Sequence, residues 1–154
     1  MRNLFVYGVF IAIVVGIGLY IGVSNPPGEW YQALTKPSFN PPNWLFPPVW
    51  TILYIIIGFV GARTFIHHRA THDRTLAMTF WFAQMILNFA WSPTFFGFQH
   101  IALGLAVIVG LLVCVVGFIA TSRKQDGLSA ALFLPYLAWV AFASLLNGSI
   151  LVLN

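Results

Sequence analysis

The sequence predicts an all-α fold, an integral membrane bundle of five transmembrane helices. Of its 154 residues, 60% are hydrophobic and only 6% are charged, and the mean hydropathy is +0.89, which is far too apolar for an ordinary soluble domain. Five long runs contain no Asp, Glu, Lys or Arg, and each has about the 20 residues that a membrane-spanning helix needs. Five spans nearly fill the chain and exclude a separate soluble catalytic or nucleotide-binding domain.

We expect residues 1–154 to form a single membrane domain. The first span is predicted at 4–23, and it is interpreted as a retained helix because its apolar run is too long for a signal peptide and no cleavage site follows it. The second is predicted at 44–62, with Pro47 and Pro48 near its first turn, where proline is tolerated. The third (76–98) and the fourth (101–122) are separated by two residues, which predicts an antiparallel hairpin. The fifth is predicted at 128–153.

The proline-rich segment 24–43 is predicted to be a structured lid loop. Residues 29–35 have the composition for about two helical turns, and Lys36-Pro37 ends them because proline cannot continue a helix and disfavours helical geometry in the residue before it.

The basic residues predict an orientation in the membrane. If the spans alternate in direction, one side carries Arg2, Arg63, Arg69, Arg74, Arg123 and Lys124, and Lys36 stands alone on the other. The positive-inside rule then places the N-terminus in the cytoplasm and favours a bacterial inner membrane. This distribution accounts for the net charge of +4, so no nucleic-acid partner is expected. The lone Cys114 excludes an internal disulfide and a multi-cysteine metal site, and no metal site is predicted.

Three tryptophans lie deep in the predicted spans. At a rise of about 1.5 Å per residue, Trp50 is about 9 Å and Trp91 about 10 Å from the outer end of its span, and Trp139 is near the middle of the fifth span. A buried indole N–H requires a protein acceptor or a ligand. Trp44 and Trp81 lie near span ends, where the interfacial belt accommodates them.

Polar and aromatic residues recur at helical spacing beside these tryptophans. Gln84, Asn88, Trp91 and Phe95 share one face of the third span, and Pro135, Trp139, Ala143 and Asn147 share one face of the fifth. Such stripes indicate either interhelical hydrogen bonds or a pocket beneath the lid. A pocket of this composition suits a large, flat, mostly apolar guest with one or two acceptors. No intramembrane charge is available to couple active transport, and the deep region contains no histidine for hydrolysis.

Small residues form stripes along the first span. Gly8, Ala12 and Gly16 lie on one stripe, and Gly18 and Gly22 on another. These stripes predict close packing within the bundle or a homodimer seam, for which Gly18 is the test position.

Four motifs occur in order along the chain: Trp30-Tyr31-x-x-Leu34-x-Lys36-Pro37-x-x-x-Pro41-Pro42, Pro48-x-Trp50-x-x-Leu53-Tyr54, Gln84-x-x-x-Asn88-x-x-Trp91-x-Pro93-x-Phe95-Phe96-Gly97, and Pro135-Tyr136-Leu137-x-Trp139. Together they resemble the TspO/MBR family, the tryptophan-rich sensory proteins of bacteria, which are similar to the mitochondrial translocator protein or peripheral benzodiazepine receptor. The resemblance implies a five-helix membrane bundle, usually a homodimer, that binds porphyrins such as protoporphyrin IX and haem. The resemblance also implies that, as in some members of the family, the bundle binds cholesterol and synthetic isoquinoline or benzodiazepine ligands.

The resemblance also implies a ligand site under the first loop. Carried over by position, it comprises Trp30, Tyr31, Pro41, Trp50, Tyr54, Gln84, Asn88, Trp91, Trp139 and Ala143. The sequence departs from some members in two places: the C-terminal residues 145–154 lack the reported cholesterol-recognition pattern, and Val109 replaces an acidic residue of the fourth span.

Three functions follow as hypotheses. The first is a porphyrin-binding membrane sensor or regulator of tetrapyrrole metabolism or the stress response, with no obligatory cofactor and no catalytic residue. The second is an enzyme that degrades porphyrins with light and oxygen, in which Trp50 and Trp139 would act as redox-active or orienting indoles. The third is a translocator of porphyrins or lipids.

Overall fold

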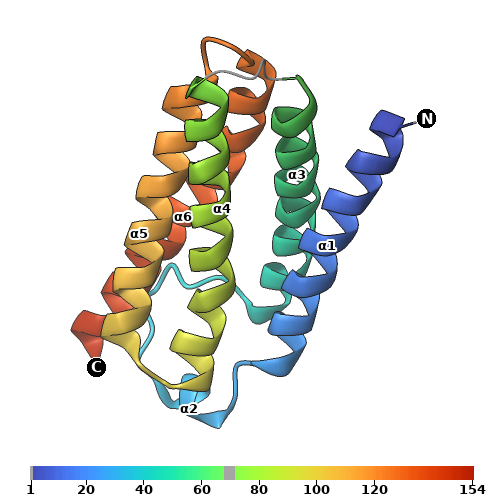
Figure 1. Ribbon diagram of the computed structural model, residues 1–154. Helices are drawn as coiled ribbons and strands as arrows, with labels where there is room; N and C mark the ends of the chain where they lie inside the picture. The colour runs from blue at the N-terminus through green and yellow to red at the C-terminus, as the bar shows by residue number, and fades with distance from the viewer. Residues whose placement is uncertain (1, 68–71) are drawn as a thin grey trace.

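The computed structural model describes residues 2–67 and 72–154, and in these residues every regular element is helical (Figure 1). Five long helices form the body, namely α1 (Arg2–Ser24), α3 (Phe46–His67), α4 (His72–Ser92), α5 (Ile101–Ser122) and α6 (Gly127–Leu153). Three short elements join or extend them: α2 (Glu29–Ala33), the 3-10 turn η1 (Asn43–Leu45) and the π-helical turn η2 (Pro93–Gly97). The all-α prediction is confirmed.

Four of the five predicted spans coincide with helices that are long and apolar enough to cross a membrane. Within the described residues these are α1, the segment Asn43–His67, α5 and α6. α4 and η2 occupy the third predicted span, and α4 is less apolar because its sequence begins His72-Asp73-Arg74 and contains Gln84 and Asn88. Both amide side chains are buried in the bundle, so they lower the hydropathy of α4 without lying on its outer surface.

The helices pack as a bundle in which α1 lies at the edge. α4 packs on α5 and α5 packs on α6, whereas α1 packs mainly on α3 (Figure 1). The α1–α3 crossing depends on Gly58, because a Cβ there would lie 2.7 Å from the Cα of Ile11. Side chains of α3, α5 and α6 fill the interior, including Ile57, Val115 and Phe133.

The α4–α5 hairpin predicted from the short connection is confirmed (Figure 1). η2 ends with the amide of Phe98 donating to the carbonyl of Pro93 at 2.8 Å. Gln99 then takes a left-handed conformation with φ 56°. His100 caps α5, because its Nδ1 accepts a hydrogen bond from the amide of Leu103 at 3.3 Å.

One expectation about the tryptophans is wrong. Trp81 is not an interfacial residue: it is only 5% exposed, and its indole N–H donates to the carbonyl of Ile57 at 3.0 Å. Gly61 on α3 leaves the space for this indole, since a Cβ at Gly61 would overlap the ring. At Gly18 the first of the two alternatives for the small-residue stripes, packing within the bundle, is confirmed, because a Cβ there would overlap the ring of Tyr54 in the same chain. By contrast, Trp44 is 71% exposed, as expected.

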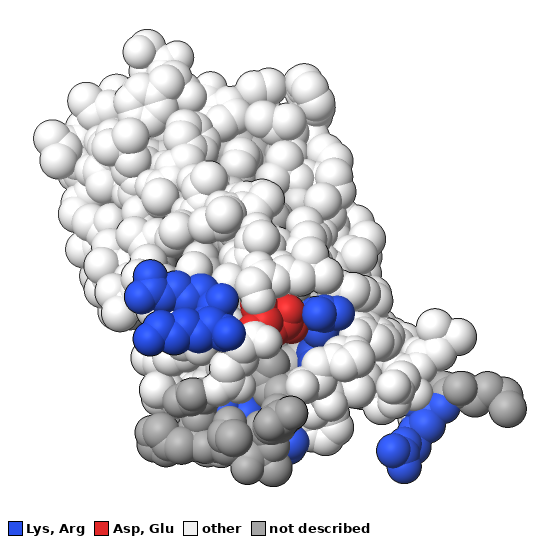
Figure 2. Space-filling model, turned by 90° about the horizontal axis from the view of Figure 1, so that it is seen from above, with Lys and Arg blue, Asp and Glu red and all other residues white. Residues whose placement is uncertain are grey.

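Basic side chains gather at one end of the bundle. This end holds the start of α1, the end of α3, the start of α4 and the α5–α6 connection (Figure 1), and seen from above it shows blue Lys and Arg groups beside a small acidic patch (Figure 2). Arg69 and His68 lie outside the described residues. Lys36 lies beyond α2 at the opposite end. The predicted segregation of basic residues is therefore present in the fold.

Asp126 anchors this basic end. Its Oδ2 lies 2.7 Å from Nε of Arg63, and its carboxylate also accepts hydrogen bonds from the hydroxyl and the amide of Ser129, which cap α6. Burial alone would raise the pKa of Asp126, but the hydrogen bonds from Arg63 and Ser129 outweigh burial and lower it below the ordinary value. The pair joins the end of α3 to the start of α6.

Candidate ligand-binding site

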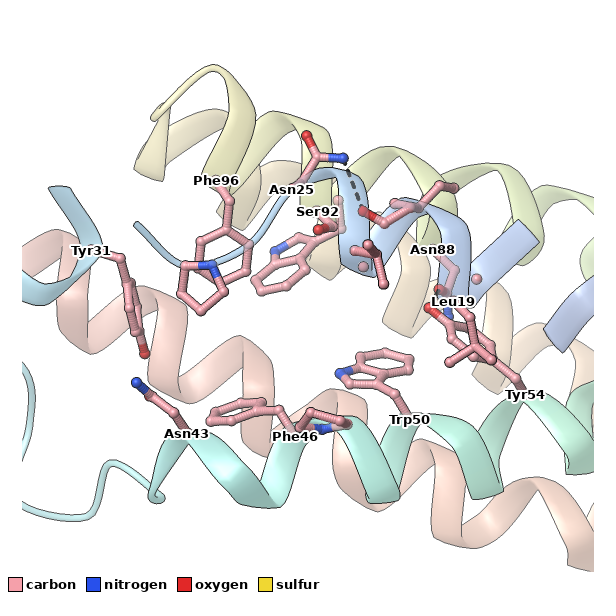
Figure 3. A pocket seen from close by; sticks show the side chains of 17 residues that line it. Leu19, Asn25, Tyr31, Asn43, Phe46, Trp50, Tyr54, Asn88, Ser92 and Phe96 are labelled. Carbon is pink, nitrogen blue, oxygen red and sulfur yellow. Dashed lines mark hydrogen bonds between the residues drawn. The ribbon is translucent and has the colours of Figure 1, made fainter. Parts of the chain in front are cut away.

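A cavity of about 280 Å³ lies at the other end of the bundle, between α1, α3 and α4 and beneath the loop that contains α2. In Figure 3, Tyr31 and Phe96 lie at one end of it, Tyr54 and Asn88 at the other, and the indole of Trp50 extends from α3 along one wall. Its described wall residues are Gly18, Leu19, Ile21, Gly22, Val23, Asn25, Pro27, Tyr31, Asn43, Phe46, Pro47, Trp50, Tyr54, Asn88, Trp91, Ser92 and Phe96. None of these side chains is charged.

A smaller cavity of about 30 Å³ extends the site toward α6. It is lined by Trp139, Ala143 and Asn147 of α6, and it shares the aromatic wall residues Tyr31, Phe46, Trp50, Trp91 and Phe96 with the larger cavity. The two spaces are therefore separated by aromatic side chains rather than by backbone.

Aromatic rings also tie the lid to the bundle. Tyr31 of α2 is 4% exposed and packs edge-on against Phe96 with ring centroids 5.3 Å apart. Lys36 covers its ring, with Nζ 4.6 Å from the centroid. Burial raises the pKa of the Tyr31 hydroxyl, and a hydrogen bond to Asn40 only partly offsets this rise. Tyr31 thus remains a neutral phenol at the mouth of the cavity.

The lid is also held from the C-terminal end of α6. The side-chain amide of Asn154 accepts a hydrogen bond from the amide of Thr35 and donates one to the carbonyl of Thr35, both at 2.9 Å. This paired contact fixes the chain just after α2, so the loop lies in a defined position above the cavity.

Polar groups at the deep end of the cavity form one hydrogen-bonded chain. The hydroxyl of Tyr54 donates to Oδ1 of Asn88 at 3.4 Å, Nδ2 of Asn88 donates to the hydroxyl of Tyr136 at 2.6 Å, and that hydroxyl donates to Oε1 of Gln84 at 2.7 Å. Three helices, α3, α4 and α6, are linked by this chain.

The deep indoles have different partners. Nε1 of Trp91 donates to Oδ1 of Asn147 at 3.2 Å, so the two polar stripes meet directly. Nε1 of Trp139 is buried and has no hydrogen-bond partner among the described residues. The indole N–H of Trp139 is thus a buried donor that a bound molecule can use.

Residues 9–153 match the sequence profile of the TspO/MBR family. The chain belongs to the TspO/MBR family. The tryptophan-rich protein TspO of Chlorobaculum tepidum is 38% identical over 150 residues, which cover 94% of this chain and 95% of that protein. Protein CrtK of Rhodobacter capsulatus is 40% identical over 133 residues, covering 86% of this chain and 83% of that protein. The human translocator protein is 34% identical over 137 residues, covering 85% and 80%.

This TspO/MBR chain brings most of the predicted site residues to the two cavities. Tyr31, Trp50, Tyr54, Asn88, Trp91, Trp139 and Ala143 line one or both of them. Three predicted residues line neither. Trp30 packs on Phe95 with ring centroids 5.8 Å apart, Pro41 is half-buried in the lid and accepts a hydrogen bond from Asn40, and Gln84 is fully buried behind Asn88.

The same TspO/MBR cavities include residues that the site prediction missed. Phe46 lies at the start of α3, and Gly18 and Gly22 open the α1 wall. The small-residue stripe of the first span is a signal for the two glycines, although by itself it predicts helix packing or a dimer seam rather than a cavity wall. Asn147 was placed on the correct stripe, and its role as the acceptor for Trp91 required the position of the opposite helix.

The TspO/MBR fold offers no group of three or more His, Cys, Asp or Glu that could hold a metal ion among the described residues. His68 of the basic segment lies outside those residues. The lining of the two cavities supplies aromatic faces, neutral amides and hydroxyls.

Proposed function

We propose that this chain binds porphyrins such as protoporphyrin IX or haem in its aromatic cavity and so acts as a membrane sensor of tetrapyrroles. The observation that carries the proposal is the composition of the wall, in which Tyr31, Phe46, Trp50, Trp91 and Phe96 surround a space whose described lining carries no charge. A flat apolar molecule stacks on such rings, and the few amides and hydroxyls offer it one or two hydrogen bonds.

The size of the site favours a ligand that occupies both cavities. The larger cavity, about 280 Å³, is at the lower end of the roughly 300–1,000 Å³ common for small-molecule pockets. A porphyrin would need the adjoining space beside Trp139 and Ala143 as well. Rotation of a shared aromatic side chain would join the two spaces without moving a helix.

Titration of protoporphyrin IX against tryptophan fluorescence tests the proposal. The full chain in lipid nanodiscs is titrated in the dark, which keeps photochemical breakdown separate from binding. Trp50→Phe combined with Trp139→Phe should weaken binding about tenfold, because each substitution removes one ring of an indole and the change at Trp139 also removes a buried N–H donor. Trp44→Phe is the matched control, since Trp44 is exposed and lines neither cavity. An unchanged affinity in the double variant would refute the proposed site.

We also propose that α4 with η2 forms a fifth span and that the basic end faces the cytoplasm of a bacterial inner membrane. Support comes from the outer surface of α4, where the exposed Phe82 and Ile86 are apolar, and from the gathering of basic residues at one end (Figure 2). Single cysteines at Lys36 and Lys124 should react with an impermeant maleimide from opposite sides of the membrane. Labelling of both from one side would refute this topology.

A further inference from the structure

The chain of hydrogen bonds that begins at Tyr54 ends inside the protein at Gln84, where only one of the two polar atoms of the side-chain amide is hydrogen-bonded to a described residue. The side chain of Gln84 is fully buried, and its Oε1 accepts from Tyr136. Its Nε2 has no hydrogen-bond partner among the described residues. A buried donor without a partner is costly, so this end of the chain is held in an unfavourable arrangement.

The same four side chains have a second arrangement of nearly the same shape. A half-turn of a terminal amide exchanges its oxygen and nitrogen, and a phenolic hydrogen rotates freely. After both amides turn, Nε2 of Gln84 donates to Tyr136, the hydroxyl of Tyr136 donates to Asn88, and the amide of Asn88 donates to the oxygen of Tyr54. The 2.6 Å and 2.7 Å contacts of Tyr136 are kept in this reversed direction.

Reversal changes what the cavity offers to a ligand. In the observed direction the hydroxyl hydrogen of Tyr54 is directed at Asn88, and Tyr54 can only accept. In the reversed direction the hydrogen is free to point into the cavity, which Tyr54 lines (Figure 3). In the reversed direction Oε1 of Gln84 replaces Nε2 as the buried atom without a partner, and the free hydroxyl hydrogen lies at Tyr54, where an acceptor atom of a ligand can satisfy it.

We propose that Gln84, acting through Tyr136 and Asn88, sets the direction of the Tyr54 hydroxyl and so makes the cavity selective for flat ligands that carry a hydrogen-bond acceptor. The inference rests on the proposed function, because it concerns a ligand in the same cavity. Gln84 is a positioning residue: it lines neither cavity, and it acts on the ligand only through the hydrogen bonds of Tyr136 and Asn88.

Replacement of Gln84 by methionine gives an unusual expectation. Methionine cannot accept strongly from Tyr136, so the fully buried Tyr136 hydroxyl keeps a good acceptor only by donating to Asn88, which is the reversed direction. The Tyr54 hydrogen then points into the cavity even without ligand. Preference for an acceptor-bearing ligand should therefore rise about fivefold or more, the effect of one unsatisfied buried hydrogen bond.

The probes for the test are acridine and anthracene, which share one flat three-ring shape and differ by a ring nitrogen acceptor. Binding of each to the full chain in lipid nanodiscs is measured by quenching of tryptophan fluorescence, at alkaline pH so that acridine is unprotonated, with empty nanodiscs correcting for partition into lipid. The ratio of the two affinities is compared in the unmodified chain, Gln84→Met, Tyr54→Phe and the double variant. Gln32→Met is the matched control, because Gln32 is exposed and lines neither cavity.

The ratio separates positioning from a structural role. The proposal expects the acridine preference to rise in Gln84→Met, to be lost in Tyr54→Phe and to stay lost in the double variant. Equal weakening of both probes in Gln84→Met, or a gain that persists without the Tyr54 hydroxyl, would overturn it. Should Gln84→Met fail to fold, an acridine preference that survives in Tyr54→Phe would still overturn it. If neither probe nor protoporphyrin IX binds the unmodified chain, the proposed function fails, and this inference fails with it.

Discussion

The hydrogen bonds of Asn147 allow a quantitative prediction of how much this side chain stabilises the bundle beside the site. Asn147 is 2% exposed, and its side chain accepts from Nε1 of Trp91 at 3.2 Å and donates to the carbonyl of Ile101 at 3.1 Å. Asn147→Leu preserves the branched shape of the side chain and removes both bonds. The Trp91 N–H then lacks its acceptor, which costs about 1–2 kcal/mol, and the Ile101 bond adds about 0.6 kcal/mol, typical of a side-chain bond in a membrane protein.

The expected loss of about 2 kcal/mol in the free energy of unfolding is measured by titrating the chain in mixed micelles with dodecyl sulfate, followed by circular dichroism. Ser144→Ala is the matched control: Ser144 is on the same helix, and its hydroxyl donates only to the carbonyl of Val140 one turn away. Trp91→Phe should cost less in the Asn147→Leu background than alone, because the pair shares one bond. If Asn147→Leu unfolds at the same free energy as Ser144→Ala, the Trp91 bond does not stabilise the bundle.

Two further predictions concern the two ends of the molecule. Because the pKa of Asp126 lies below its ordinary value, its ionised form stabilises the fold above about pH 4, and this contribution is lost as the pH falls through the lowered pKa. In Asp126→Asn, the free energy of unfolding measured across that pH range should depend less on pH than it does in the unmodified chain. An unchanged pH profile would argue against the ion pair. Asn154→Ala removes both bonds to Thr35 and should speed proteolysis within the lid severalfold, whereas Val152→Ala, also at an exposed position, should not.

Helix positions followed closely from the sequence, because the apolar runs are long and the breaks between them are marked by charge or proline. α5 begins and ends where its uncharged run was predicted, at Ile101 and Ser122. α3 continues to His67, beyond the predicted end at residue 62, because Arg63 ends the apolar run but is a good helix former, and its charge is paired with Asp126. A partner that lies 63 residues further along the chain cannot be inferred from local composition.

Side-chain depth was less predictable than helix position. Trp50, Trp91 and Trp139 were recognised from their depth along a span, which is a property of one helix. The burial of Trp81 depends on the space beside Gly61 of another helix, and the position of Gln84 behind Asn88 depends on Tyr136. Spacing along a helix identifies which face is polar, but only the packing of neighbouring helices decides which residue of that face meets the cavity.

The neutrality of the cavity lining has a consequence for the membrane in which the chain resides. Each elementary charge that crosses a membrane potential gains or loses about 2.3 kcal/mol per 100 mV. The described residues around both cavities carry no ionised group, and the Arg63–Asp126 pair lies at the opposite end of the bundle. Occupation by an uncharged ligand therefore moves no charge through the field, so an energised and a de-energised cell should bind such a ligand equally, whereas a ligand with ionised carboxylates would bring its own charge into the field.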